Sequence, residues 1–143
     1  MEYGHGGDIY SQNIKMDFSA NINPLGLPEG VREALYGAIS RCQCYPDSRC
    51  RDLAEGLSLY HSLPKEWIIC GNGGADLIFS LVFAQKPERA VLLAPTFSEY
   101  SQALKAAGCS ITYFDLPPEN GFALDTDEFC SFLKEAGNLK GGM

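Results

Sequence analysis

Residues 71–76 read GNGGAD and place three glycines and an asparagine between two apolar runs. The run before them is WIIC at residues 67–70, and the run after them begins at Leu77. The N-terminus of a helix presents unpaired N–H groups and a partial positive charge, and glycines let an anion approach those groups closely. The stretch therefore predicts an anion site, in particular one for a phosphate. The residues alone leave an alternative open, a tight turn that binds nothing and has Asp76 as a first-turn acid.

The common nucleotide-binding loops and zinc sites do not fit this sequence. Residues 71–76 are not G-x-G-x-x-G, because residue 76 is Asp, and they lack the Lys-Ser/Thr pair of a Walker loop. Three of the six cysteines form C-x-C-x5-C at Cys42, Cys44 and Cys50. That spacing matches none of the usual zinc patterns, so we expect reduced, structural thiols and no metal site.

The composition bounds the class of protein. The chain has 143 residues, of which 45% are hydrophobic, and a formal net charge of −7. The length corresponds to about one domain, and the apolar content is enough for a core. The acidic balance argues against nucleic acid as a partner, since a nucleic-acid surface needs a basic footprint. We find no apolar run that could span a membrane and no signal peptide, so we expect a cytoplasmic protein that does not contact a membrane.

The elements that must position the glycine loop fall into three segments. Residues 1–27 show no sustained hydrophobic period and are rich in turn residues, which predicts an extended N-terminal arm. Residues 28–65 carry two amphipathic helical patterns, the first with Pro28 at its first position and the second with Ser48 or Asp47 near its start. Residues 66–143 alternate between strand and helix patterns and predict part of an α/β cofactor-binding domain.

Within this α/β part the sequence predicts short apolar strands, which are typical of a covered parallel sheet. The expected strands are 67–70, 90–94 and 110–116. The expected helices are 74–85, apolar almost all round and therefore buried, then 98–107, ended by Gly108, and finally one that Asp125 caps and that runs to about residue 136. Because three strands make a thin sheet for this pattern, we expect the chain to be truncated.

Four short segments follow one another along the chain: FSANINPLG at 18–26, YPD at 45–47, GNGGADLI at 71–78 and APTFSEY at 94–100. Together they resemble the N-terminal part of the fold-type I pyridoxal-phosphate (PLP) enzymes of the aminotransferase class I/II group. The resemblance covers nearly the whole chain. It implies an N-terminal arm and the first part of the large domain of these PLP transferases, an α/β fold with a parallel-type sheet flanked by helices.

The resemblance implies a PLP site and a homodimer. Gly73, Gly74 and Ala75 would offer backbone N–H groups to the phosphate of PLP, and Phe97 would stack on the pyridine ring. Tyr45 would reach the PLP phosphate of the neighbouring subunit, so the dimer would be the functional unit. The residues alone also allow Phe97 to be a core aromatic and Tyr45 a turn aromatic that packs on the following helix.

The resemblance also implies a phosphorylated amino-acid substrate. HGG at residues 5–7 followed by DFSANINP at 17–24 is most similar to the threonine-phosphate decarboxylases, with the histidinol-phosphate aminotransferases as close relatives. His5 and Asn21 would bind the substrate's phosphate, for which an imidazolium and an amide are suitable donors. A solvated histidine in a loose arm and an asparagine that serves a turn are the alternatives.

The implied activity is removal of the carboxylate of L-threonine O-phosphate, a step of cobalamin biosynthesis. Transamination of histidinol phosphate or another amino acid is the alternative in the same fold. A truncated α/β module that only binds or interacts is an alternative of another class. None of the six lysines matches the family lysine that forms a Schiff base with PLP. We therefore assign no catalytic residue and expect the 143-residue chain alone to be inactive.

Overall fold

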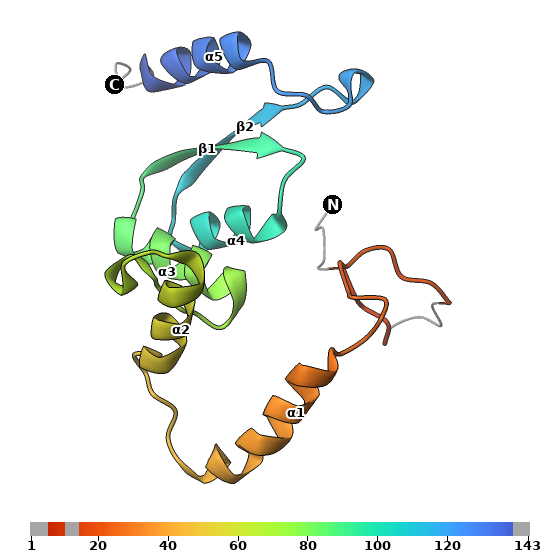
Figure 1. Ribbon diagram of the computed structural model, residues 1–143. Helices are drawn as coiled ribbons and strands as arrows, with labels where there is room; N and C mark the ends of the chain where they lie inside the picture. Colours follow the sequence, from red (N-terminus) through yellow and green to blue (C-terminus); the bar gives the residue numbers. More distant parts are fainter. Residues whose placement is uncertain (1–5, 11–14, 139–143) are drawn as a thin grey trace. The chain divides into compact units, whose positions relative to one another are not determined.

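Figure 1 shows the computed structural model of the chain, which describes residues 6–10 and 15–138. The chain divides into two units, Met1–Cys70 and Gly71–Met143, called here the N-terminal and the C-terminal unit. Among the described residues, no helix is both long enough and apolar enough to cross a membrane.

The N-terminal unit is helical in the part that the structure describes. Its elements are α1 (Glu29–Ala38), the 3-10 helix η1 (Ile39–Gln43), α2 (Arg51–His61) and the 3-10 helix η2 (Lys65–Trp67). Pro28 stands at the N-cap of α1 with φ −58° and ψ 142°, one residue before the first helical residue, Glu29, and not at the first helical position as predicted. Ser62 ends α2 in the left-handed conformation, and Pro64 follows two residues later.

The C-terminal unit is built on a small parallel sheet. Its elements are α3 (Gly73–Gln85), β1 (Arg89–Ala94), α4 (Ser98–Ala106), β2 (Ser110–Asp115), the 3-10 helix η3 (Pro118–Asn120) and α5 (Thr126–Asn138). β1 and β2 pair in parallel, in a register that runs from Arg89 opposite Ser110 to Ala94 opposite Asp115. α4 connects the strands and contacts both, and α3 packs against α4. The predicted α/β fold with a parallel sheet flanked by helices is confirmed.

The core lies around β2, between helices on opposite faces of the sheet (Figure 1). Ala103 and Leu104 of α4 are buried, as are Cys109 and Phe114. The ring of Phe114 meets the rings of Phe129 and Phe132 edge to face, with both centroid distances at 5.1 Å, and so anchors α5.

Two predicted helix ends are confirmed in this unit. Gly108 has φ +75° and donates its N–H to the carbonyl of Lys105, as a glycine C-cap should. At the start of α5, Oδ1 of Asp125 accepts hydrogen bonds from the N–H groups of Asp127 and Glu128, each at 3.0 Å.

The predicted strand at residues 67–70 is wrong. Trp67 ends the 3-10 helix η2, and the residues after it lie outside any sheet. Ile68 has the extended conformation, with φ −110° and ψ 123°. Extended backbone becomes a strand only when a neighbour pairs with it, and the described residues supply no such neighbour.

The predicted burial of the helix at residues 74–85 is also wrong. This segment forms α3, but none of its residues is buried, and Leu81 is 62% exposed. The helix is apolar on every side, whereas its packing against α4 covers one side only. An apolar sequence on nearly all sides of a helix therefore does not predict how many of those sides other elements cover.

Candidate cofactor and substrate sites

The glycine loop enters α3 through two short hydrogen bonds. The N–H of Asn72 donates to Oδ2 of Asp76 at 2.9 Å, and the N–H of Gly73 donates to the carbonyl of Gly71 at 2.9 Å. The side chain of Asn72 caps nothing. In the part of the chain that the structure describes, the N–H groups of Gly74 and Ala75 have no protein acceptor. Of the three predicted phosphate donors, Gly73 thus has its N–H engaged within the loop, whereas the N–H groups of Gly74 and Ala75, at the positive end of the helix dipole, remain available to a ligand.

The three glycines of the loop have different duties. A Cβ at Gly71 would lie 2.8 Å from the side chain of Leu77, so any larger residue there would require Leu77 to move. Gly73 has φ +85°, a conformation that side-chain-bearing residues rarely adopt. A Cβ at Gly74 would meet no atom within 4 Å. Two glycines thus serve the backbone, and the third leaves open space beside the unused N–H groups.

Asp76 behaves as the alternative interpretation, a turn that binds nothing, predicted for it. Its carboxylate closes back on the loop and accepts the N–H of Asn72, which is the behaviour of a first-turn acid at a helix N-terminus. The Asp76 carboxylate accepts a hydrogen bond from Asn72 only, so the N–H groups of Gly74 and Ala75 stay without a protein acceptor in the described part of the chain.

Phe97 stands between β1 and α4, at the N-cap position of that helix. Its ring is half exposed and meets the ring of Tyr100 edge to face, with centroids 5.8 Å apart. It follows the carboxyl end of β1 by three residues. Ligands of open α/β sheets bind outside the carboxyl ends of the strands, so Phe97 lies at the edge where a ring can be offered to a ligand.

The arm is held together by a clip, defined here as Gly6, Gly7, Asp17 and Ser19. A Cβ at Gly6 would lie 2.0 Å from the carbonyl oxygen of Ser19, so the two backbones touch. The N–H of Gly7 donates to Oγ of Ser19 at 2.8 Å, and that hydroxyl donates to Oδ1 of Asp17 at 2.5 Å. These contacts join the HGG opening to the DFSAN segment.

The clip also sets the charge state of Asp17. Oδ1 of Asp17 accepts the Ser19 hydroxyl and the Ser19 N–H, and together these hydrogen bonds hold the pKa of the carboxyl below its ordinary value. The Asp17 carboxylate therefore stays ionised while it holds Ser19 in place.

The two residues expected to bind the substrate's phosphate flank this clip in sequence. His5 lies outside the described residues, and Gly6 follows it directly. Asn21 is exposed and stands two residues after Ser19. The clip therefore joins the backbone beside His5 to the backbone that leads to Asn21.

Tyr45 lies in the connector between η1 and α2. Its side chain is fully exposed, so it does not pack on the following helix. Tyr45 and Asn21 belong to the N-terminal unit, whereas the predicted phosphate loop and Phe97 belong to the C-terminal unit.

The cysteines show no metal chemistry in the described residues. All six are free, Cys109 is buried, and Cys42 and Cys44 are exposed. Within the described ranges, no three His, Cys, Asp or Glu side chains are grouped so that they could hold a metal ion.

Sequence reasoning missed the residues that organise the arm and the connector. Gly6, Ser19 and Asp47 do so through contacts that depend on the folded backbone. Only Asp47 carried a usable signal, because it stands near the predicted start of a helix. The close approach of Gly6 to Ser19 joins residues 13 apart in sequence and has no local signature.

Comparison with known proteins decides the family. Residues 13–141 match the family described as aminotransferase class I and II. The chain belongs to this family. The resemblance inferred from the four segments is thereby confirmed, and PLP is the cofactor of this aminotransferase family.

Two relatives and a solved structure show how far the likeness extends. Threonine-phosphate decarboxylase of Salmonella typhimurium is 37% identical, over 96% of this chain and 42% of its own length. Histidinol-phosphate aminotransferase of Desulfitobacterium hafniense is 38% identical, over 68% of this chain and 27% of its own length. The crystal structure of the histidinol-phosphate aminotransferase from Clostridium acetobutylicum matches with a TM-score of 0.69 and 26% identity, over 82% of this chain and 34% of that chain. The chain thus spans less than half the length of these relatives.

The glycine loop and Phe97 each have the chemistry that one part of PLP needs. Gly74 and Ala75 offer two N–H groups beside open space, which suits a phosphate at a helix N-terminus. The half-exposed ring of Phe97 suits stacking on a planar cofactor.

Proposed function

We propose that this chain is the N-terminal part of a PLP-dependent enzyme that decarboxylates L-threonine O-phosphate in cobalamin biosynthesis. The observation that carries the cofactor assignment is the pair of unused N–H groups of Gly74 and Ala75 at the open start of α3. The decarboxylase assignment is supported by the relative of that name, whose similarity extends over 96% of this chain.

In this proposal the C-terminal unit binds and orients the cofactor. The N–H groups of Gly74 and Ala75 donate to its phosphate, and the dipole of α3 adds favourable charge. The ring of Phe97 stacks on the pyridine and limits its tilt. When bound, PLP supplies an electron sink for the carbanion that loss of CO2 leaves behind.

The N-terminal unit binds the substrate in this proposal. Asn21 donates its amide N–H to the substrate's phosphate, and His5 adds an imidazolium. The clip supports this role, because it ties together the two stretches of backbone that carry these residues. Tyr45 contacts the PLP phosphate of the neighbouring subunit, which makes a cytoplasmic homodimer the functional form. Its fully exposed side chain supports a contact outside its own unit.

A second candidate is transamination of histidinol phosphate. Its support is the 0.69 TM-score with the Clostridium acetobutylicum enzyme and the 38% identity with the Desulfitobacterium hafniense enzyme. Both candidate substrates carry a phosphate, so the clip and Asn21 serve either one.

An assay of the full-length protein that contains this chain separates the two candidates. The purified protein is loaded with PLP and given L-threonine O-phosphate, or histidinol phosphate with 2-oxoglutarate. CO2 release from threonine phosphate is the expected result. Amino transfer from histidinol phosphate without CO2 release would establish the second candidate. A PLP-loaded protein that turns over neither phosphate would contradict both.

A further inference from the structure

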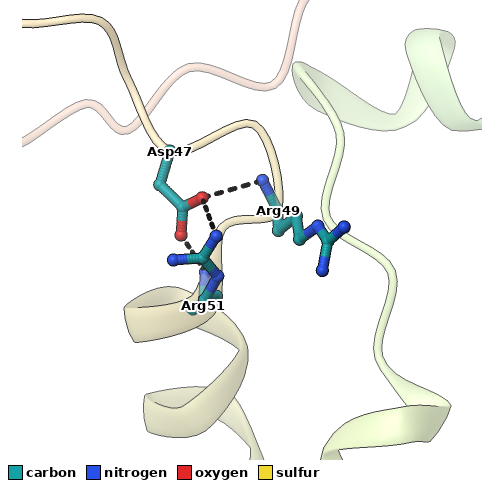
Figure 2. A network of polar contacts seen from close by, with 3 residues as sticks. All are labelled: Asp47, Arg49 and Arg51. Atoms are coloured by element: carbon teal, nitrogen blue, oxygen red, sulfur yellow. Dashed lines mark hydrogen bonds and ion pairs between the residues drawn. The ribbon is translucent and has the colours of Figure 1, made fainter.

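The connector that carries Tyr45 is fastened to α2 by one carboxylate, that of Asp47 (Figure 2). Oδ1 of Asp47 accepts the N–H of Arg49 at 3.1 Å, and Oδ2 accepts the N–H of Arg51 at 2.9 Å. The guanidinium of Arg51 lies 3.7 Å from Oδ1 and adds an ion pair that is largely exposed. Asp47 thus occupies the backbone donors that lead into the first turn of α2.

Backbone hydrogen bonds also connect Asp47 to the start of α2. The N–H of Cys50 donates to the carbonyl of Asp47 at 2.9 Å, and the N–H of Ala54 donates to the carbonyl of Cys50 at 2.8 Å. Cys50 has φ +46° and ψ 41°, the left-handed conformation that residues other than glycine seldom adopt. Hydrogen bonds on both sides of Cys50 hold it in this conformation, and Asp47 supplies most of them.

Little freedom remains between Asp47 and Tyr45. Pro46 alone separates them, and its ring fixes its own φ near −65°. A residue that precedes proline is restricted to extended backbone, so Tyr45 has a narrow range of backbone conformations. The backbone at Tyr45 is therefore restricted by how Asp47 is held on α2.

We infer that Asp47 is a positioning residue for the cofactor contact of Tyr45. It anchors the connector on α2 and so restricts the backbone from which the exposed Tyr45 side chain reaches the PLP phosphate of the neighbouring subunit. This inference rests on the proposed function. Asp47 itself touches no cofactor; it acts by limiting the conformations from which Tyr45 makes its hydrogen bond.

The test is a double-mutant cycle on PLP affinity in the full-length protein. Absorbance titrations give the dissociation constant of PLP for wild type, Tyr45→Phe, Asp47→Ala and the double variant. Tyr45→Phe removes a hydrogen bond to a charged group and should raise the constant about 10-fold or more. Asp47→Ala should raise the PLP dissociation constant by a smaller factor when Tyr45 is present. In the Tyr45→Phe background the same substitution should raise it by less than about 2-fold, because the effects of coupled residues are not additive.

Two further variants separate positioning from a general loss of stability. Asp125→Ala removes an equivalent cap, since Asp125 also accepts two backbone N–H groups at a helix start, and it carries no proposed ligand contact. It should leave the PLP dissociation constant unchanged. Asp47→Asn keeps a cap oxygen and should stay closer to wild type than Asp47→Ala. It also serves as the readout if Asp47→Ala fails to fold.

The outcomes are distinct. An Asp47→Ala effect of the same size with and without the Tyr45 hydroxyl would overturn the inference, and so would an equal loss in Asp125→Ala. Normal PLP binding that neither Tyr45→Phe nor Asp47→Ala weakens would overturn the inference and leave the rest of the cofactor site standing. A wild-type protein that binds no PLP would overturn the proposed function itself.

Discussion

The two units hold their proposed ligand groups in different ways. Every side chain that the described structure buries lies in the C-terminal unit, around Phe114 and Leu104. In the N-terminal unit, Tyr45 and Phe18 are almost fully exposed, and local hydrogen bonds organise the arm and the connector. The proposed cofactor loop therefore belongs to the unit that has a packed core, whereas the arm and the Tyr45 connector depend on local hydrogen bonds.

The largest expected effect tests this contrast with the same substitution in each unit. Phe114 is 7% exposed and contacts two other rings, so Phe114→Ala should destabilise the C-terminal unit by about 3–5 kcal/mol. Phe18 is 90% exposed, so Phe18→Ala should change stability by less than about 0.5 kcal/mol. Urea denaturation of the 143-residue chain, followed by circular dichroism, measures both. Equal losses for the two variants would show that the contrast between the units is wrong.

The second prediction concerns substrate binding in the N-terminal unit. If the proposed function holds, Asn21→Ala in the full-length enzyme removes the proposed hydrogen bond to the substrate's phosphate, worth about 1.5–3 kcal/mol, and should raise KM for threonine phosphate about 10- to 100-fold. The PLP dissociation constant should not change, because Asn21 carries no proposed contact with the cofactor. Steady-state kinetics measures KM, and a PLP titration measures the dissociation constant of the cofactor. An unchanged KM would remove Asn21 from the substrate site.

The part of this fold that sequence predicts is the part that local rules decide. Gly108 ends α4 and Asp125 begins α5 because a left-handed glycine and a side-chain cap act within a few residues. The segments predicted at 90–94 and 110–116 are strands because they pair with each other, with α4 as the connection between them. Residues 67–70 have a similar apolar pattern but no partner, and pattern alone cannot distinguish the two situations.

The same distinction applies to the candidate site. The glycine loop and its place at a helix start follow from the sequence, since three glycines there exceed what a turn needs. Which glycine serves which purpose does not, because the contact of Gly71 with Leu77 and the open space at Gly74 exist only in the folded loop. The anchoring role of Asp47 likewise depends on the conformation of Cys50.

The third prediction separates stability from binding within the glycine loop. Gly71→Ala brings a methyl group 2.8 Å from Leu77 and should destabilise the fold by about 1–3 kcal/mol. Gly74→Ala meets no neighbour and should stabilise the helix by about 0.5–1 kcal/mol. The same methyl group occupies the space beside the unused N–H groups, so Gly74→Ala should weaken PLP binding. Denaturation and PLP titration of both variants provide the check, and a Gly74→Ala protein that binds PLP as wild type does would place the phosphate elsewhere.

The smallest effect is a pH dependence of the Asp47 and Asp17 contacts in the N-terminal unit. Hydrogen bonds from the N–H groups of Arg51 and Arg49 hold the pKa of Asp47 below its ordinary value of 3.8, and the Ser19 hydroxyl does the same for Asp17. A carboxyl whose pKa is lower in the folded state contributes its full stabilisation above the ordinary pKa, and this contribution is lost as the pH falls through the folded pKa. Both contacts should therefore be intact at neutral pH and loosen only below about pH 4.

The two units can be followed separately by NMR as the pH is lowered from about 5 toward about 2, the range in which these carboxyls take up protons. The amide signals of Arg49 and Gly7 should change first, because their acceptors lie in the Asp47 cap and the clip. Ring signals of Phe114 should persist to lower pH, because its contacts with Phe129 and Phe132 carry no titratable group. Asp47→Asn should abolish the Arg49 transition and leave that of Gly7 in place, which assigns each transition to its own carboxylate. If the Phe114 signals instead move at the same pH as those of Arg49, the core of the C-terminal unit is not independent of the Asp47 and Asp17 contacts, and the contrast between the units is wrong.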